Sequence, residues 1–242
     1  MKALVYTGEK SLDFCEVPDP KLKDDENLIS IRSVGICGSD MHAYLGHDDR
    51  RPAPLILGHE AAGDVIEGPL KGERVTINPL VSCQKCKECK SNRSNLCGKR
   101  QIISMQPREG AFAELVAMPS RNLVKVPDDI SFNDAALTEP LAVCWHAVRL
   151  GLEALDTDIS SANTLVIGGG AIGLGSALSL MAKGIKKIKI AEPNEKRRAF
   201  LQANTWFDVY DPTKGHGDLS CYHIAIDAVG FSSSRSDACA LA

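Results

Sequence analysis

Residues 164–173 read Thr-Leu-Val-Ile-Gly-Gly-Gly-Ala-Ile-Gly, and an apolar segment, 174–182, follows directly. The run of apolar and β-branched residues predicts a short buried strand, and the segment after the glycines predicts a helix. Gly168, Gly170 and Gly173 fit the pattern Gly-x-Gly-x-x-Gly in this strand–turn–helix setting. The first glycine permits a tight turn, the second lets the backbone approach a pyrophosphate, and the third lets helix and strand pack closely.

The helix that follows would direct its free N–H groups at a pyrophosphate, which predicts a dinucleotide site. We expect this site to include Gly168, Gly170, Ala171, Ile172 and Gly173. A second strand is predicted to end at Glu192, about twenty residues further on, where an acid binds a ribose hydroxyl and repels a 2′-phosphate. This favours NAD over NADP. Arg197, with a basic residue on either side, could still serve a phosphate.

The segment beyond Glu192 predicts a helix over 194–204, strands over 207–210 and 223–227, and part of another helix over 236–242. A doubly wound nucleotide-binding sheet has six strands, and four are predicted here. We therefore expect residues 151–242 to form an α/β domain whose parallel sheet is C-terminally incomplete.

The first 150 residues show a different pattern, in which short apolar runs alternate with turns rich in Gly, Pro and Asp. This spacing predicts an all-β barrel or sandwich. Strands are expected over 3–6, 14–17, 28–34, 63–67, 74–78, 110–118 and 123–126. A capping box at 131–134 predicts the start of a helix, which Glu139-Pro140 is expected to interrupt before helical periodicity resumes over 141–150. The predicted domains are therefore 1–150 and 151–242.

The stretch from Cys37 to Glu60 holds, within 24 residues, a thiol, four carboxylates, a serine hydroxyl and three histidines. Cys37, His59 and Glu60 are all donors that bind zinc. Three protein ligands with an open fourth position are typical of a catalytic zinc. The alternative is a buried cysteine and three ordinary histidines in a loop.

Four more cysteines follow with the spacing C-x2-C-x2-C-x7-C: Cys83, Cys86, Cys89 and Cys97. The surrounding segment, 83–97, is too polar to form a core of its own, and four thiolates around one zinc ion would hold it together. An iron–sulfur cluster also takes four cysteines, but this run lacks a closely spaced fourth cysteine followed by proline. Uncoordinated thiols are the remaining alternative.

The composition excludes several classes of partner. The 242 residues carry 28 Lys and Arg against 31 Asp and Glu, a formal net charge of -3, which gives no footprint for nucleic acid or an anionic membrane. No apolar run approaches the length of a membrane span. Residues 1–6 predict a strand and not a signal peptide, so we expect a cytoplasmic protein whose cysteines bind metal instead of forming disulfides. Cys15, Cys144, Cys221 and Cys239 lack ligand spacing and are expected to be buried or incidental thiols.

Several motifs occur together in one order: Gly35–Asp40, Gly58-His59-Glu60, the four-cysteine segment, Glu139-Pro140-Leu141-Ala142 and the glycine loop. In this the chain resembles the zinc-dependent medium-chain dehydrogenase/reductase family of the alcohol dehydrogenase superfamily, and most closely its polyol/sorbitol-dehydrogenase-like branch. The resemblance covers essentially the whole chain. It implies a GroES-like β-barrel catalytic domain followed by a Rossmann doubly wound sheet.

The resemblance also implies roles for individual residues. Cys37 and His59 match two ligands of a catalytic zinc, and Glu60 matches an acid that ligates this zinc or lies beside it. Glu139 matches the position where the polyol-type branch has a glutamate at the zinc site. Ser39 and His42 match a hydroxyl and a histidine that relay a proton outward. The four-cysteine segment matches the structural-zinc lobe.

The implied activity is transfer of a hydride from a secondary alcohol, such as a polyol or sugar alcohol, to NAD. It would use one catalytic and one structural Zn²⁺ in a homodimer or homotetramer, if the chain is complete. One alternative is a truncated, non-catalytic relative that still binds zinc and nucleotide. A zinc-free quinone-reductase-type enzyme is disfavoured, because it would not need Cys37, His59 and the cysteine lobe together.

Overall fold

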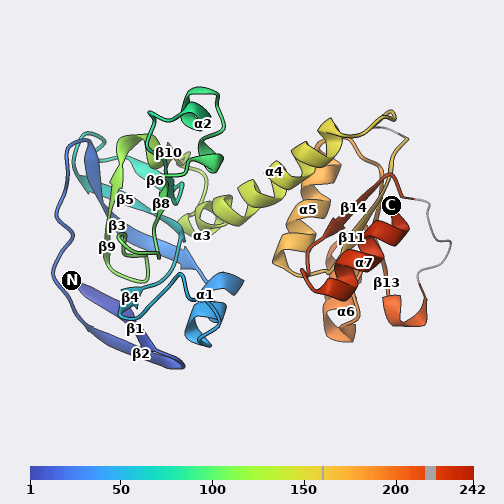
Figure 1. Ribbon diagram of the computed structural model, residues 1–242, viewed down its shortest axis with the longest axis horizontal. Helices are drawn as coiled ribbons and strands as arrows, with labels where there is room; N and C mark the ends of the chain where they lie inside the picture. The colour runs from blue at the N-terminus through green and yellow to red at the C-terminus, as the bar shows by residue number, and fades with distance from the viewer. Residues whose placement is uncertain (160, 216–221) are drawn as a thin grey trace. The chain divides into compact units, whose positions relative to one another are not determined.

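The computed structural model describes residues 1–159, 161–215 and 222–242. The chain divides into two compact units, Met1–Glu139 and Pro140–Ala242, which are coloured from blue to yellow-green and from yellow to red in Figure 1. Cys221, one of the cysteines predicted to be incidental, lies outside the described residues. Within the described ranges, no helix has the length and apolar character needed to cross a membrane.

The first unit consists mainly of antiparallel strands arranged in three sheets (Figure 1). The largest sheet has the order β10-β6-β5-β3-β9, and smaller sheets have the orders β2-β1-β4 and β7-β8. The strands are β1 (Lys2–Gly8), β2 (Ser11–Glu16), β3 (Glu26–Gly35), β4 (Leu55–Ile56), β5 (Glu60–Glu67), β6 (Arg74–Ile77), β7 (Leu80–Val81), β8 (Gln101–Ile102), β9 (Leu115–Pro119) and β10 (Leu123–Lys125). The predicted all-β first domain is confirmed, although the strand expected over 110–118 begins only at Leu115.

The core of this unit is centred on the pairing of β3 with β5. Ile29, Ala61 and Val65 are almost completely buried there. The two strands approach so closely that a Cβ atom on Gly63 would lie 2.1 Å from the carbonyl oxygen of Ser30. A glycine is therefore required at position 63 for this pairing.

A short helix, α1 (Gly38–Tyr44), follows β3 directly. The sequence predicted no helix in this stretch, and the reason for its formation is local. Cys37 is the N-cap, and its N–H donates to Asp40 Oδ2 at 3.0 Å. This bond satisfies a backbone donor at the helix start. The remaining short helical segments are α2 (Lys87–Lys90), α3 (Phe132–Ala136) and 3-10 turns at Ser94–Leu96 and Ser120–Asn122.

The predicted helix start near residue 131 is confirmed, since the Ser131 hydroxyl accepts from the N–H of Asp134 at 3.1 Å. The predicted interruption at Glu139-Pro140 is wrong. The break between the two helices lies at Leu137, two residues before Glu139, and α4 (Thr138–Glu153) continues through both Glu139 and Pro140. Pro140 is tolerated because it lies in the first turn of α4, where backbone N–H groups have no partner within the helix.

The second unit contains a four-stranded parallel sheet with the order β13-β12-β11-β14. Its strands are β11 (Asn163–Ile167), β12 (Lys187–Ala191), β13 (Asp208–Tyr210) and β14 (Ile224–Asp227). Its helices are α4 from Pro140 onward, α5 (Ala171–Ala182), α6 (Glu195–Asn204) and α7 (Ser232–Leu241), with a 3-10 turn at Pro212–Lys214. This is the order of the first four strands in a doubly wound sheet, as predicted.

Both faces of this sheet are covered. Val166 on β11 packs with residues of α5 and α6, including Leu180 and Leu201. Leu165 and Ile167, which point to the opposite face, pack with residues that include Leu241 of α7. Burial on both faces explains why β11 is a continuous apolar run instead of an alternating one.

Candidate functional site

The pairing of β3 and β5 brings the two ends of the Cys37–Glu60 stretch together. Gly35 at the end of β3 is the register partner of Glu60 at the start of β5. Cys37 lies two residues beyond this pair and His59 one residue before it. Ligand atoms of Cys37, His59 and Glu60 consequently all lie within 4.8 Å of one another.

The missing side chain of Gly35 makes room for the Glu60 carboxylate. A Cβ atom at position 35 would lie 2.2 Å from Glu60 Oε2. His59 and Glu60 are buried and Cys37 is half-buried. One thiolate, one imidazole and one carboxylate at this separation fit a single zinc ion.

Asp40 is a residue of this site that the sequence did not single out. It is buried, and its Oδ1 accepts from the N–H of Gly58 at 3.1 Å and lies 3.5 Å from Nδ1 of His59. Its Oδ2 accepts from the N–H of Cys37. Asp40 therefore touches the backbone on both sides of the site. The sequence does contain one signal for Asp40, since an acid three residues after a helix N-cap is at the position of a capping-box carboxylate.

Cys37, Asp40 and His59 shift one another's pKa. The nearby His59 lowers the pKa of Cys37, although burial opposes this change. Burial alone would lower the pKa of His59, but Asp40 and Cys37 outweigh it and raise the pKa of His59 to about 10. The site thus favours a thiolate beside a positive charge. A zinc ion bound here would take the place of the imidazole proton.

The charge of Glu139 interacts with the charges of the same site, but Glu139 is not part of the donor group of Cys37, His59 and Glu60. Burial raises the pKa of Glu139; His59 opposes this change, while the negative charges of Glu60 and Asp40 add to it. The structure therefore places Glu139 near the donors, at the first turn of α4, without bringing it into the cluster.

Ser39 and His42, the predicted relay residues, line one polar pocket of about 480 Å³. The other residues that line it are His47, Asp48, Asp49 and Arg50. The rings of His42 and His47 have centroids 6.4 Å apart, and both side chains are exposed. The half-buried Ser39 thus lies between the metal-compatible donors and a pocket that reaches solvent.

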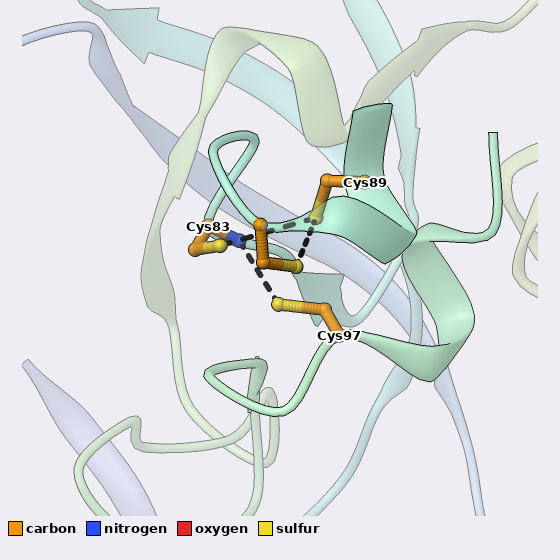
Figure 2. Close-up of side chains that lie close together, drawn as sticks. Cys83, Cys89 and Cys97 are labelled. Carbon is orange, nitrogen blue, oxygen red and sulfur yellow. Dashed lines mark hydrogen bonds between the residues drawn. The ribbon is translucent and has the colours of Figure 1, made fainter. Parts of the chain in front are cut away.

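The four cysteines of segment 83–97 converge in space, as Figure 2 shows for Cys83, Cys89 and Cys97. The sulfur of Cys89 lies 3.5 Å from that of Cys86 and 3.9 Å from that of Cys83. Tetrahedral zinc with Zn–S bonds of about 2.3 Å separates its ligands by roughly 3.8 Å. Backbone N–H groups, foremost that of Lys85, lower the pKa of Cys83 to about 6, which favours a thiolate. The lobe therefore fits a structural zinc.

The glycine loop of the second unit has the predicted geometry. Gly168 has a φ of 94°, and a Cβ atom on Gly173 would lie 1.8 Å from the carbonyl oxygen of Gly168. A Cβ on Gly170 would meet nothing within 4 Å, so the space above this residue is open. Gly170 is also the N-cap of α5, which has no side-chain cap. Backbone N–H groups of Ala171 and Ile172 are thus available to an anion.

Glu192 packs beneath this loop and is only 1% exposed. Its Oε2 accepts from the N–H of Gly169 at 2.8 Å and from Arg197 at 3.0 Å, and its Oε1 accepts from the N–H of Asn194 at 2.8 Å. Burial opposes ionisation, but these donors together hold the pKa of Glu192 below its usual range. Glu192 therefore shapes the loop directly, a contact that the sequence did not predict.

The chain is similar to known alcohol and polyol dehydrogenases. The model of the alcohol dehydrogenase GroES-like domain matches residues 23–128. Over 88% of its length, the chain is 37% identical to L-galactonate-5-dehydrogenase of Escherichia coli K12 and covers 62% of that protein. Residues 23–128 therefore belong to the alcohol dehydrogenase GroES-like domain family, and the similarity of the chain supports a zinc-dependent medium-chain dehydrogenase/reductase. Its relatives also include the sorbitol dehydrogenase of Bacillus subtilis 168 (34% identity over 79% of this chain and 56% of that protein).

Solved structures of other dehydrogenases agree with the fold. A protein from Sinorhizobium meliloti 1021 bound to NADP superimposes with a TM-score of 0.88 at 26% identity, covering 100% of this chain and 73% of that one. An alcohol dehydrogenase from Escherichia coli CFT073 in complex with NADH gives a TM-score of 0.84 at 25% identity, covering 96% and 70%. The chain spans 54% to 62% of the length of its first four curated relatives.

Proposed function

We propose that this protein is a zinc-dependent oxidoreductase that transfers a hydride from a secondary alcohol, specifically a polyol or sugar alcohol, to NAD. The observation that carries the proposal is the convergence of Cys37, His59 and Glu60 on one point, beside a polar pocket. The similarity to L-galactonate-5-dehydrogenase and sorbitol dehydrogenase supports a polyhydroxylated substrate.

In this proposal Cys37, His59 and Glu60 hold a catalytic zinc, and Glu139 adds a carboxylate to its surroundings. Asp40 orients the His59 ring through the 3.5 Å contact with Nδ1. The four cysteines of the lobe hold a second, structural zinc. When bound, the catalytic zinc supplies a Lewis acid that lowers the pKa of an alcohol, and NAD supplies the hydride acceptor.

The proton of the substrate hydroxyl must leave the site as the hydride leaves the carbon. Ser39 lies next to the donors and accepts this proton at Oγ. Its own proton passes into the pocket that it shares with His42, whose exposed imidazole accepts it. The product is the corresponding carbonyl compound.

We infer that residues 151–242 form the nucleotide-binding domain and residues 1–150 the catalytic domain. The nucleotide would be held by Gly168, Gly170, Ala171, Ile172 and Gly173, with Glu192 at the ribose. The acidic Glu192 favours NAD, and Arg197 lies close enough to Glu192 to be part of the same subsite. The homodimer or homotetramer and the cytoplasmic location stay predictions.

Metal analysis combined with a substrate panel tests the proposal. We expect about two zinc ions per chain and formation of NADH absorbance with at least one polyol or sugar alcohol. Cys37→Ser should remove one zinc and the turnover while the fold remains. One zinc per chain in the unmodified protein, unchanged by Cys37→Ser, would instead support a non-catalytic relative that keeps only its lobe.

A further inference from the structure

Arg51 is a buried arginine close to the proposed relay hydroxyl, and neither the proposed metal site nor the nucleotide site uses it. Only 4% of its surface is exposed. A guanidinium carries five N–H donors and a permanent charge, so burial requires several partners. Its Nε donates to the carbonyl oxygen of Ser104 at 2.9 Å, its Nη1 pairs with Asp48, and its Nη2 lies 3.5 Å from Ser39 Oγ.

Two of these partners are themselves fixed. Ser104 is 0% exposed and has a φ of 68°, an uncommon conformation for a residue other than glycine. This turn aims its carbonyl group at Arg51. The Asp48 carboxylate is also held by Arg50, through bonds of 2.7 and 2.9 Å. With two edges of the guanidinium anchored, the third edge is directed at Ser39.

The charges around Ser39 favour loss of the proton from its hydroxyl group. Asp48 supplies one negative charge and is paired with two guanidinium groups, so the triad carries a net positive charge. Asp49 and the imidazoles of His42 and His47 complete the pocket lining. Because arginine only donates, Ser39 Oγ must be the acceptor in its contact with Arg51. The Ser39 O–H is therefore directed away from Arg51.

We propose that Arg51 is a positioning residue for proton transfer, which holds the Ser39 hydroxyl so that its own proton leaves toward His42 as Oγ takes the substrate proton. The inference rests on the proposed function. In the step, the substrate O–H bond breaks, a new O–H bond forms on Ser39, and the original Ser39 proton leaves toward His42. The competing possibility is that Arg51 only ties its own loop to Ser104 and thereby stabilises the unit.

A double-mutant cycle separates the two roles. The variants are Arg51→Met, Ser39→Ala and the pair together, with zinc content and melting temperature measured for each. With Ser39 present, we expect Arg51→Met to slow NADH formation at saturating substrate about tenfold or more. In the Ser39→Ala background, the same substitution should slow it by less than about twofold. Equal factors in the two backgrounds would overturn the proposal.

Arg108→Met is the matched control, because Arg108 is a largely buried arginine that pairs with Glu26 at 2.8 Å elsewhere in the same unit. We expect it to lower the melting temperature but to leave the pH profile of turnover unchanged. If Arg51→Met does not fold, Arg51→Lys replaces it, since lysine keeps the charge but cannot span three partners. If Arg51→Lys turns over as fast as the unmodified protein, the positioning role of Arg51 is contradicted.

A second readout does not depend on turnover. Cobalt(II) replaces the catalytic zinc, and the pH midpoint of its visible spectrum is measured. We expect Arg51→Met to raise this midpoint when Ser39 is present and to leave it unchanged in Ser39→Ala. If the unmodified protein binds two zinc ions but oxidises no alcohol, the proposed function fails. The cobalt midpoint then still decides for or against the contact between Arg51 and Ser39.

Discussion

The Asp40 carboxylate and the His59 ring lie 3.5 Å apart, Oδ1 facing Nδ1, and both side chains are buried. A carboxylate beside one ring nitrogen fixes which nitrogen carries the proton and leaves the other to a metal. Asp40 is itself held by the N–H groups of Cys37 and Gly58. The same carboxylate thus organises the backbone and the imidazole of the proposed zinc site.

Asp40→Asn should weaken zinc binding at this site by about 10- to 100-fold, because the amide keeps the shape but loses the charge that orients His59. Competition with a chelator measures the affinity of the weaker of the two sites. The four-cysteine lobe should keep its zinc. Asp64→Asn, on an acid of β5 that pairs with Arg32 at the surface, is the control and should change neither site. Equal affinity in Asp40→Asn and the unmodified protein would exclude the role of Asp40.

Cys97→Ser should remove the zinc of the lobe and lower the stability of the first unit by more than about 2 kcal/mol. The segment 83–97 has few apolar contacts of its own, and Cys97 is the buried member of the four ligands. Thermal unfolding with metal analysis provides the measurement. Cys15→Ser, at an exposed cysteine outside the lobe, is the control. A melting temperature that Cys97→Ser leaves unchanged would show that the lobe does not depend on a metal.

Two glycines of the nucleotide loop should respond differently to the same added methyl group. Gly170→Ala meets no atom within 4 Å, so we expect normal stability but about tenfold weaker NAD binding or worse, because the methyl occupies the space for the pyrophosphate. Gly173→Ala would place its Cβ 1.8 Å from Gly168 O and should unfold or distort the loop. Calorimetry for binding and thermal unfolding for stability distinguish the two. Undiminished NAD binding by Gly170→Ala would place the pyrophosphate elsewhere.

The free energy of unfolding should fall in acid partly because the Asp48 carboxylate becomes protonated. Hydrogen bonds from Arg50, and next to it Arg51, lower the pKa of Asp48 to about 2 in the folded protein. A carboxylate whose pKa is lower in the folded than in the unfolded protein stabilises the fold. This contribution is complete at pH values above the unfolded-state pKa of about 4 and is lost as the pH falls through 2. It amounts to about 2 kcal/mol after allowance for the exposed Arg50.

The measurement is urea unfolding of Asp48→Asn and the unmodified protein at several pH values. The difference in unfolding free energy should be full near pH 5 and should shrink as the pH falls from 4 toward 2. A difference that stays constant over this interval would mean that the charge of Asp48 contributes nothing.

The sequence predicted best where the information is local. The glycine loop has a spacing that only a strand–turn–helix phosphate site requires, and the order of β11 to β14 follows from one repeated βα pattern. The cysteine lobe is equally local, since its four ligands lie within 15 residues. In each case neighbours in the sequence are also neighbours in space.

The misses have the opposite character. The role of Asp40 depends on Gly58 and His59, which reach it only because β3 pairs with β5. The contact between Glu192 and Gly169 depends on parallel pairing of β11 with β12. The sequence predicts a helix break at Pro140, whereas its true place within the first turn of α4 depends on where that helix begins. Pairing partners and helix starts are set by packing, which periodicity alone does not encode.

The Glu60 carboxylate occupies the space that a side chain at position 35 would fill, and this gives a test of its role. In Gly35→Ala the new Cβ would lie 2.2 Å from Glu60 Oε2 and 3.2 Å from Glu60 Cβ. The carboxylate is the movable end of its side chain, so we expect it to swing away while the strand pairing remains. Zinc affinity at this site should then fall about tenfold with little loss of stability.

Glu60→Gln and the double variant complete this test. If Glu60 is a ligand, Gly35→Ala should weaken zinc binding in the unmodified background and have no further effect in Glu60→Gln. Chelator competition gives the affinities, and thermal unfolding confirms that β3 and β5 remain paired. An equal loss of affinity in both backgrounds would mean that Gly35→Ala acts by shifting Cys37 or His59. The carboxylate of Glu60 would then lie beside the metal without binding it.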